Sequence, residues 1–442
     1  MMEITSANQS HAYRMLQCLT VANRPLYVAE LAEILAFDFN EAKGGIPKLN
    51  PNWRWDNREQ AVLSICSSFV TVVPNYRSPI VQFSHFSVKE FLMSDRLASS
   101  RRDISQYHIS LLDAHTLLAQ ASLAILLRDP EVDGLTDRVA LAGYAAKHWT
   151  THARFENIAS QLRDGMVDLF DPDKPYFEAW AKSHDMDAKN GIYFRGTSGS
   201  ELRARPLYYA ALCGFLELVE NLTLKYPQYA SVRSGYFGTP LHSASFEGYL
   251  PVVRYLLRHG VNVNVRNSTD STPLLLASRK GHLDVVQCLL EHGADTNLLD
   301  LQNNAPLTWA AHFAYVNVVQ LLLEHNADVN CQNKYGSTPL HDVMWGDRFN
   351  AEPAQIVRLL LKHGADPNAR NHFLHTPFHL VSMRADLLDV LRLLLEHGAD
   401  LDAKDKKGRT PLQLSLVCCR DKVTRLLSEY SNRSMLGSVT SV

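Results

Sequence analysis

The second half of the chain repeats with a period close to 33 residues. A short motif of the type Thr-Pro-Leu-His recurs six times, with spacings of 33, 33, 33, 38 and 34 residues between its prolines, which are Pro240, Pro273, Pro306, Pro339, Pro377 and Pro411. A second block of the type His-Gly-Ala-Asp follows five of these motifs and begins at His259, His292, His325, His363 and His397. A period of this size indicates a solenoid of stacked units, each too small to bury its apolar face alone.

One unit shows how the repeat folds. Thr272 is placed to cap a helix, and Pro273 suits the first helical turn, where no N–H donor is needed. Gly281 then interrupts the chain. The segment Leu283–Leu290 carries apolar residues at helical spacing, and Gly293 stands where a left-handed residue ends a helix. Each unit is therefore predicted to be two antiparallel helices followed by a turn.

These motifs resemble the ankyrin repeat, and the resemblance covers roughly residues 201–430. A weaker copy at Arg205–Ala211 precedes the six clear ones, so we expect about seven units, with the first and the last as capping repeats. The resemblance implies a mainly α-helical solenoid that works by binding a protein partner. It implies no catalytic activity.

Two units depart from the pattern. In the fourth unit Ala314 replaces the glycine between the helices and Asn326 replaces the glycine at the end of the second helix. A positive φ at Ala314 would cost roughly 1 kcal/mol, whereas asparagine tolerates that conformation. The fifth unit carries an insertion, Met344–Asn350, which contains Trp345. Such an insertion is either part of a binding face or a tolerated surface loop.

The first 100 residues show no period and predict a small winged-helix-like α+β domain. The expected helices are Ala12–Val21, Tyr27–Phe37, Ala61–Cys66 and Ser87–Leu97, and the expected hairpin pairs Phe69–Val73 with Ile80–Phe83.

Three segments of this region, Leu16–Thr20, Val28–Ala32 and above all Phe83–Leu92, resemble the part that follows the nucleotide-binding NACHT module in fungal NACHT–ankyrin proteins. The resemblance implies kinship with NLR-like signalling or surveillance proteins that carry an ATPase switch, of which this chain would be the part after the ATPase. The sequence contains no Gly-Lys dipeptide and so no P-loop. Nucleotide hydrolysis is therefore not expected.

Between the two halves we expect a helical connecting region. Its helices are Ile104–Leu127, Asp137–Trp149 and Ile158–Phe170, the aromatic cluster Tyr176, Phe177 and Trp180 packs among them, and Lys189–Ser200 is a hinge. The predicted organisation is a winged-helix-like domain at residues 1–100, the connecting region at 101–200, the ankyrin repeats at 201–430 and a flexible tail at 431–442.

The net charge and the cysteine pattern limit the partners and the cellular compartment that we expect. The 44 Lys plus Arg and 46 Asp plus Glu give a net charge of -2, so no global field attracts nucleic acid or an anionic membrane. The seven cysteines are scattered without a C-x-x-C pair, which favours reduced thiols in the cytoplasm or the nucleus. The apolar stretch Leu118–Leu127 is too short to span a bilayer.

Catalytic and metal sites are not expected. Nine of the 19 histidines fall at recurring repeat positions, which stacked units hold roughly 8–10 Å apart, whereas zinc ligands must converge on one point. His372, His375 and His379 are close in sequence, but His379 belongs to the repeat template. His341 and Asp342 are neighbours on a helix and point in different directions. We predict no metal and no cofactor.

Partner binding is expected at the positions that the repeat template leaves free, mostly in the turns between units. These residues are Arg266, Asn267, Asp270, Leu299, Gln302, Asn303, Lys334, Tyr335, Trp345, Arg370, His372, Phe373 and Lys407. The alternative is that they are simply solvated. Two other functions stay open: a regulatory fragment whose ATPase lies on another chain, and nucleic-acid binding by the N-terminal domain. The helix expected at Ala61–Cys66 has no Arg or Lys to face phosphates, which argues against the second.

Overall fold

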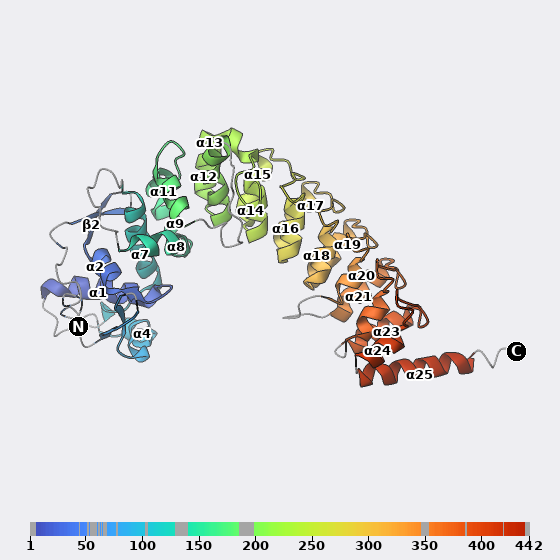
Figure 1. The fold of residues 1–442 in the computed structure, drawn as a ribbon. Coiled ribbons are helices and arrows are strands. Elements are labelled where there is room, and N and C mark those ends of the chain that lie inside the picture. Colours follow the sequence, from blue (N-terminus) through green and yellow to red (C-terminus); the bar gives the residue numbers. More distant parts are fainter. Residues whose placement is uncertain are drawn as a thin grey trace. The chain divides into compact units, whose positions relative to one another are not determined.

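The computed structural model of the protein describes residues 6–43, 45–50, 69–76, 78–101, 105–128, 140–184, 199–345, 353–384, 387–418 and 420–437, together with Trp53, Gln60, Val62 and Ser64 (Figure 1). The chain forms two compact units, residues 1–229 and residues 230–442.

The first unit begins with a small α+β domain. Its elements are α1 (Ser6–Val21), β1 (Leu26–Tyr27), α2 (Val28–Leu35), β2 (Phe37–Lys43), β3 (Ile46–Leu49), β4 (Val70–Val73), β5 (Ile80–Phe83), α4 (Phe86–Leu92) and α5 (Asp95–Ala98). Strands β1, β5 and β4 form an antiparallel sheet in that order, and β2 pairs with β3. Leu16 on α1, Leu31 on α2 and Val81 on β5 are buried in one core.

The expected hairpin is present, with Val72 opposite Val81 in the β4–β5 pair. The helix expected at Tyr27–Phe37 is shorter because Tyr27 pairs with Ile80 in β1 and Phe37 begins β2. The helix expected at Ser87–Leu97 is two helices, since the chain turns at Met93 and the Ser94 side chain caps α5. The third helix, Ala61–Cys66, lies mostly outside the described residues, so the nucleic-acid alternative stays a prediction.

In the described residues of the connecting region, five helices follow. They are α7 (Leu111–Leu126), α8 (Ala142–Ala153), α9 (Ile158–Gln161), α10 (Arg163–Leu169) and α11 (Tyr176–Ser183). Phe177 and Trp180 pack as expected, with ring centroids 5.6 Å apart, and the Trp180 indole N–H donates to Ala146 O at 2.9 Å. Tyr176 is only half-buried. Most of the expected hinge, Lys189–Ser200, lies outside the described residues.

The first repeat-like helix pair belongs to this first unit. It consists of α12 (Gly199–Cys213) and α13 (Leu216–Lys225). Tyr209 on α12 lies 5.8 Å from Trp180, and Arg154 Nε donates to Cys213 O at 2.8 Å. Lys225 forms an ion pair with Asp171 at 3.0 Å. The pair is therefore packed on the connecting helices.

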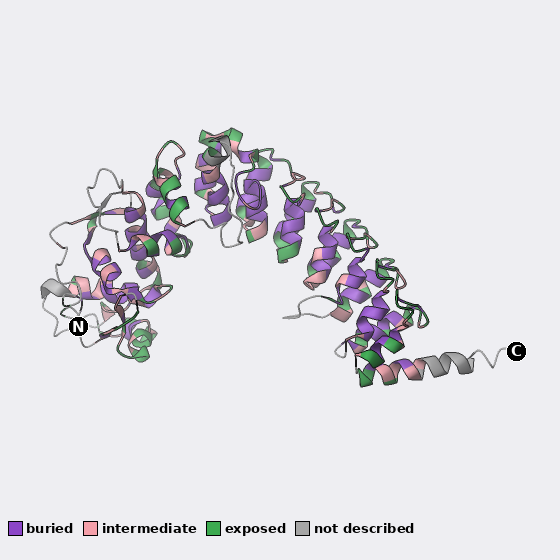
Figure 2. Ribbon diagram, in the orientation of Figure 1, coloured by how far each residue is buried: buried purple, intermediate pink, exposed green. Residues whose placement is uncertain are grey.

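The second unit is a stack of six further helix pairs (Figure 1). The pairs are α14 (Pro240–Glu247) with α15 (Leu250–Arg258), α16 (Pro273–Lys280) with α17 (Leu283–Glu291), α18 (Pro306–His312) with α19 (Val316–Glu324), α20 (Pro339–Asp342) with α21 (Pro353–Lys362), α22 (Pro377–Ser382) with α23 (Leu388–Glu396), and α24 (Pro411–Val417) with α25 (Asp421–Gly437). Figure 2 shows the buried residues in the helices and the exposed ones toward the turns. With α12–α13, the described residues form the expected seven units.

The local signals act as predicted. The Thr272 hydroxyl accepts from Leu275 N at 3.2 Å, and Gly281 ends α16 with φ +77°. A Cβ at Gly281 would lie 2.6 Å from the Tyr315 ring of the next unit, so the site requires glycine for space as well as for conformation. Ala314 and Asn326 both have positive φ, of 60° and 61°. The strain expected at Ala314 is therefore present.

Neighbouring units are joined by the turns that lead into each first helix. We call residues 267–271, 300–304, 333–337, 371–375 and 405–409 the finger turns. Successive finger turns are linked by backbone hydrogen bonds, such as Lys334 N to Gln302 O at 2.9 Å and His372 N to Tyr335 O at 2.9 Å. These bonds align the turns in a continuous strip.

A second set of links was not foreseen. Four asparagines, Asn264, Asn297, Asn330 and Asn368, each accept from a backbone N–H of the following unit and donate to one of its carbonyls. For Asn297 the distances are 2.8 Å to Asp328 N and 3.3 Å to Asn326 O. We call this set the asparagine ladder.

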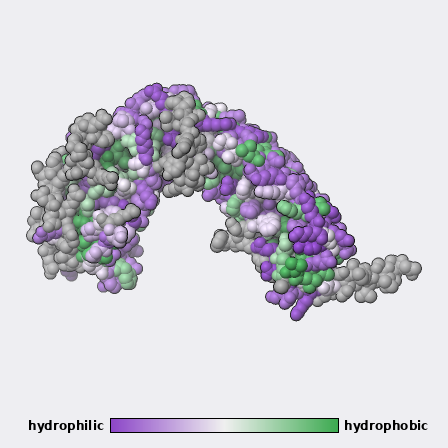
Figure 3. All heavy atoms as spheres, viewed as in Figure 1, coloured by the Kyte–Doolittle hydropathy of each residue, from purple (hydrophilic) through white to green (hydrophobic). Residues whose placement is uncertain are grey.

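The last unit differs from expectation at its end. Helix α25 continues to Gly437, within the segment 431–442 where a flexible tail was expected. Helix α24 carries Leu416 and Val417, which are exposed, and a hydrophobic patch is visible near this helix (Figure 3).

Candidate binding groove

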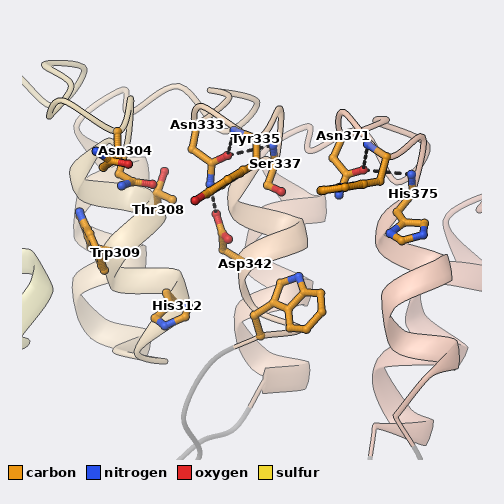
Figure 4. Close-up of a pocket in the computed structure, with 13 residues that line it drawn as sticks. Asn304, Thr308, Trp309, His312, Asn333, Tyr335, Ser337, Asp342, Asn371 and His375 are labelled. Atoms are coloured by element: carbon orange, nitrogen blue, oxygen red, sulfur yellow. Dashed lines mark hydrogen bonds between the residues drawn. The ribbon is translucent and has the colours of Figure 1, made fainter. Parts of the chain in front are cut away.

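A groove of about 610 Å³ runs across the fourth, fifth and sixth units (Figure 4). Its walls come from helices α18 and α20 and from the three finger turns at 300–304, 333–337 and 371–375. The lining residues are Gln302, Asn304, Thr308, Trp309, His312, Asn333, Tyr335, Ser337, Asp342, Trp345, Asn371, Phe373 and His375. The groove is therefore built from equivalent positions of consecutive units.

Four aromatic side chains dominate the lining. Tyr335, Trp345 and Phe373 are 53%, 55% and 55% exposed. Trp309 is half-buried, and the Arg279 guanidinium stacks on its ring at 4.7 Å from the centroid. We call Trp309, Tyr335, Trp345 and Phe373 the aromatic set. Large aromatic rings left open to solvent in a concave surface are typical of a binding site.

Trp309 is held by the finger turn next to it. Its indole N–H donates to Asp300 Oδ2 at 3.1 Å. The other oxygen, Oδ1, accepts from the backbone N–H groups of Gln302 and Asn304 at 2.8 and 2.9 Å, so one carboxylate fixes both the turn and the ring. Because Asp300 is only 9% exposed, this arrangement is preorganised before any partner arrives.

Asp342 ends α20 and brings a carboxyl group into the groove. Its side chain points toward the finger turn that holds Asn333 and Tyr335 (Figure 4), and Asn333 Nδ2 donates to Oδ2 at 3.3 Å. Burial raises the pKa of the Asp342 carboxyl to about 7, because the charged form loses hydration there. Among the described residues no Lys or Arg forms an ion pair with this carboxyl.

His341, the preceding residue, faces the opposite way. Its Nδ1 accepts from Thr338 N at 3.2 Å, so Nε2 carries the proton and donates to His375 O of the next unit at 3.0 Å. Burial lowers the pKa of His341 to about 4. The two neighbouring side chains therefore point toward different partners, as their helical spacing predicted.

His375 lines the far end of the groove. Its ring lies between Phe373 and His379, with centroids 6.0 and 5.7 Å away, and its Nε2 is 3.6 Å from Asp405 Oδ2. Burial is the main cause of its lowered pKa. His379 Nε2 donates to Arg409 O at 3.2 Å. In the described part of the chain, no three His, Cys, Asp or Glu side chains are placed to hold a metal ion.

Of the residues expected to bind a partner, four line the groove: Gln302, Tyr335, Trp345 and Phe373. One expectation is wrong. Asn267 is 4% exposed, its Oδ1 accepts from the backbone N–H groups of Thr269 and Ser271, and its Nδ2 donates to Phe237 O. It is a structural residue of the finger turn because an asparagine side chain there replaces backbone partners.

The other expected residues lie around the groove or away from it. Asp270 and Asn303 occupy the left-handed position of their finger turns, with φ of 56° and 58°. Arg266 and Leu299 are half-buried, and the exposed ones outside the lining are Asn303, Lys334, Arg370, His372 and Lys407. Their part in binding stays a prediction.

The sequence interpretation missed Trp309, His312 and Asp342, which come from the first helices and not from the turns. A signal was available. The fourth position after the helix cap is Leu276, Trp309 and Asp342 in three successive units. If this position belonged to the core, the repeat template would hold a constant residue there, whereas the residue type varies. A variable position on the first helix marks its groove-facing side.

Comparison with known proteins agrees with this architecture. The family described as ankyrin repeats (3 copies) matches residues 207–300, 296–371 and 348–435, more than half of the chain. The chain belongs to the ankyrin-repeat family. Residues 1–102 match the family described as GPI inositol-deacylase, winged helix domain. This ankyrin-repeat protein therefore carries an N-terminal domain of a type also found in an enzyme-derived family.

A curated relative, the azaphilone pigments biosynthesis cluster protein L of Monascus ruber, is 27% identical over 271 residues, 57% of this chain. The chain spans about half the length of that relative, 55%. The crystal structure of the ankyrin repeat domain of Bcl-3, a member of the IkappaB family, is 28% identical, with a TM-score of 0.42 over 47% of this chain and 92% of that one. In the described residues, no helix combines the length and apolar character that crossing a membrane requires.

Proposed function

We propose that the protein is a non-catalytic scaffold whose ankyrin array binds an extended segment of a partner protein in the groove across units four to six. The observation that carries the proposal is the aromatic set, in which three rings are more than half exposed. Because about half of each ring is already covered, burying the rest of one ring contributes roughly 1–1.5 kcal/mol, so a partner segment gains useful affinity when it reaches two or three of them.

The surroundings of the groove support the proposal. In each of the three finger turns a side-chain oxygen, Oδ1 of Asp300, Asn333 or Asn371, accepts from backbone N–H groups of the same turn, and backbone hydrogen bonds link one turn to the next. A partner therefore meets side chains that are already in place. Preorganisation of this kind reduces the ordering entropy that binding must overcome.

Selection of displayed random peptides on the full-length protein tests the proposal. The groove variant carries Tyr335→Ser and Phe373→Ser, and the control carries Gln287→Ala and Gln320→Ala, two exposed positions on the second helices. Selected peptides are expected to lose at least tenfold in affinity for the groove variant and to bind the control unchanged. Peptides that bind both variants equally would place the binding surface elsewhere.

We further propose that the chain works in an NLR-like surveillance setting in fungi, as the part that follows an ATPase module. The order of a winged-helix domain before an ankyrin array supports this, as do the segments Leu16–Thr20 and Phe83–Leu92. The chain itself is expected to show no heat of ATP binding in calorimetry. Micromolar ATP affinity would contradict the assignment and favour a regulatory role within an ATPase.

A further inference from the structure

We propose that the groove recognises an arginine side chain of the partner segment, with its guanidinium placed against the aromatic set and paired with the Asp342 carboxylate. This inference rests on the proposed function and names the chemistry of the same site. It is carried by the charges of the lining, by the existing contacts of the rings and by the presence of Asp342 in the same groove.

Among the described residues, the lining of the groove contains one acidic side chain and no Lys or Arg. This acid is Asp342, and the thirteen lining residues also include two histidines. Two acidic residues next to the lining, Asp405 and Asp300, already have partners for their carboxylates. Asp405 is paired with Arg409 at 2.7 Å, and Asp300 accepts from Trp309 and from its own turn. Within the described part of the chain, the Asp342 carboxyl accepts a hydrogen bond from Asn333 Nδ2, at 3.3 Å. A carboxylate in this setting is complementary to a positive ligand.

The aromatic rings of this region already accept cations on one face. Arg279 lies over Trp309 at 4.7 Å, and Lys334 lies over Tyr335 at 4.9 Å. Within the described residues, no such contact involves Trp345 or Phe373. Both rings are 55% exposed, and both line the groove together with Asp342. They are therefore open to a cation supplied by a partner.

Arginine fits this combination better than lysine does. Its guanidinium is planar, so one face can stack on a ring while two N–H groups reach a carboxylate. An ammonium group offers a point charge without the flat surface. An apolar side chain would cover the Asp342 carboxyl without replacing the hydration that it loses, and a neutral polar one would leave its charge unpaired, so charge and not apolar area alone should decide selectivity.

The test uses the full-length protein labelled with 5-fluorotryptophan, with the six tryptophan signals assigned by single Trp→Phe variants. The probes are the N-acetyl methylamides of arginine, citrulline, lysine and trimethyllysine, added separately and followed by ¹⁹F NMR. Citrulline is the matched control because it keeps the shape of arginine and removes the charge. Asp342→Asn tests the carboxylate, and Asp389→Asn removes an exposed acid outside the lining.

Arginine amide is expected to shift the Trp345 signal saturably, with at least threefold tighter binding than either lysine probe and no saturation by citrulline. Asp342→Asn is expected to weaken arginine binding about tenfold, whereas Asp389→Asn leaves it unchanged. Equal binding of citrulline, tighter binding of trimethyllysine, or no saturable shift with arginine would overturn the proposal. Because no partner protein is used, these outcomes are independent of the peptide selection, which tests segment binding itself.

Discussion

Acid should weaken the ankyrin array through three histidines that hold consecutive units together. His242, His341 and His379 are fully buried, and each accepts a backbone N–H at Nδ1. With Nδ1 as acceptor, Nε2 carries the only proton and donates to a carbonyl of the next unit, at 3.0 Å for His242 and His341 and 3.2 Å for His379. The neutral ring uses both nitrogens, so protonation removes the acceptor and places a charge in the core.

The size of the effect follows from the pKa values. Burial lowers the pKa of His242 and of His341 from 6.5 to about 4. Between these values the unfolded chain binds a proton that the folded chain does not, so stability falls as the pH is lowered from 6.5 toward 4 and is retained above 6.5. At about pH 5, each of these two histidines is expected to lower the free energy of unfolding by about 2 kcal/mol. Two such losses are a large part of a typical folding free energy of about 5–15 kcal/mol.

The measurement is urea unfolding of the full-length protein, followed by circular dichroism at a series of pH values. The variant is His341→Gln, because the chain itself places Gln413 at the equivalent position, where its Oε1 accepts from Thr410 N at 3.0 Å. This variant should lose about 2 kcal/mol less than the wild type between about pH 7.5 and about pH 5. His363→Gln, at an exposed position, controls for the removal of a histidine. Identical pH dependence of wild type and His341→Gln would refute the reasoning.

Three further substitutions test the geometry of the array by urea unfolding. Ala314→Gly should stabilise it by about 0.5–1 kcal/mol by relieving φ +60°, and destabilisation would mean that the alanine methyl packs favourably. Asn297→Ala should cost about 1 kcal/mol by removing one rung of the asparagine ladder, and no change would show that water replaces both bonds. Gly281→Ala should cost more than Gly293→Ala, since both have positive φ but only the first would place a Cβ 2.6 Å from Tyr315, and equal costs would contradict this.

The sequence predicted the array because its determinants are local. A threonine cap, a proline in the first turn and a glycine with positive φ act within one unit, so the period of 33 residues is enough to place the helices. The asparagine ladder was missed because each rung joins residues about one unit apart, such as Asn297 and Asp328. In the N-terminal domain, β1 escaped prediction because a strand of two residues has no periodicity and forms only by pairing with β5.

The groove was predicted only in part, again because the sequence shows local determinants and not contacts between units. Tyr335 and Phe373 stand in turns, where a residue that departs from the template is visible in the sequence. Trp309 and Asp342 stand on helices, and their common location depends on how the units stack. When the units stack, positions that are far apart in the sequence come together on one surface. Only the structure shows which of these positions lie side by side.

The departures of the fourth unit from the repeat template coincide with the groove. Thr308 lines the groove and stands where three other units have the buried bridging histidine, and its hydroxyl lies 3.6 Å from Cys331 Sγ. Trp309 follows it, and Ala314 carries backbone strain of roughly 1 kcal/mol. The fourth unit therefore lacks the histidine hydrogen bond to the next unit and contains a strained residue, so it is less stable than a unit that follows the repeat template. If Thr308 and Trp309 are kept for binding while Ala314 is incidental, Ala314→Gly should raise stability and leave the arginine probe's affinity unchanged, whereas Trp309→Leu should reduce that affinity. A loss of affinity with Ala314→Gly would instead make the strained turn part of the binding site.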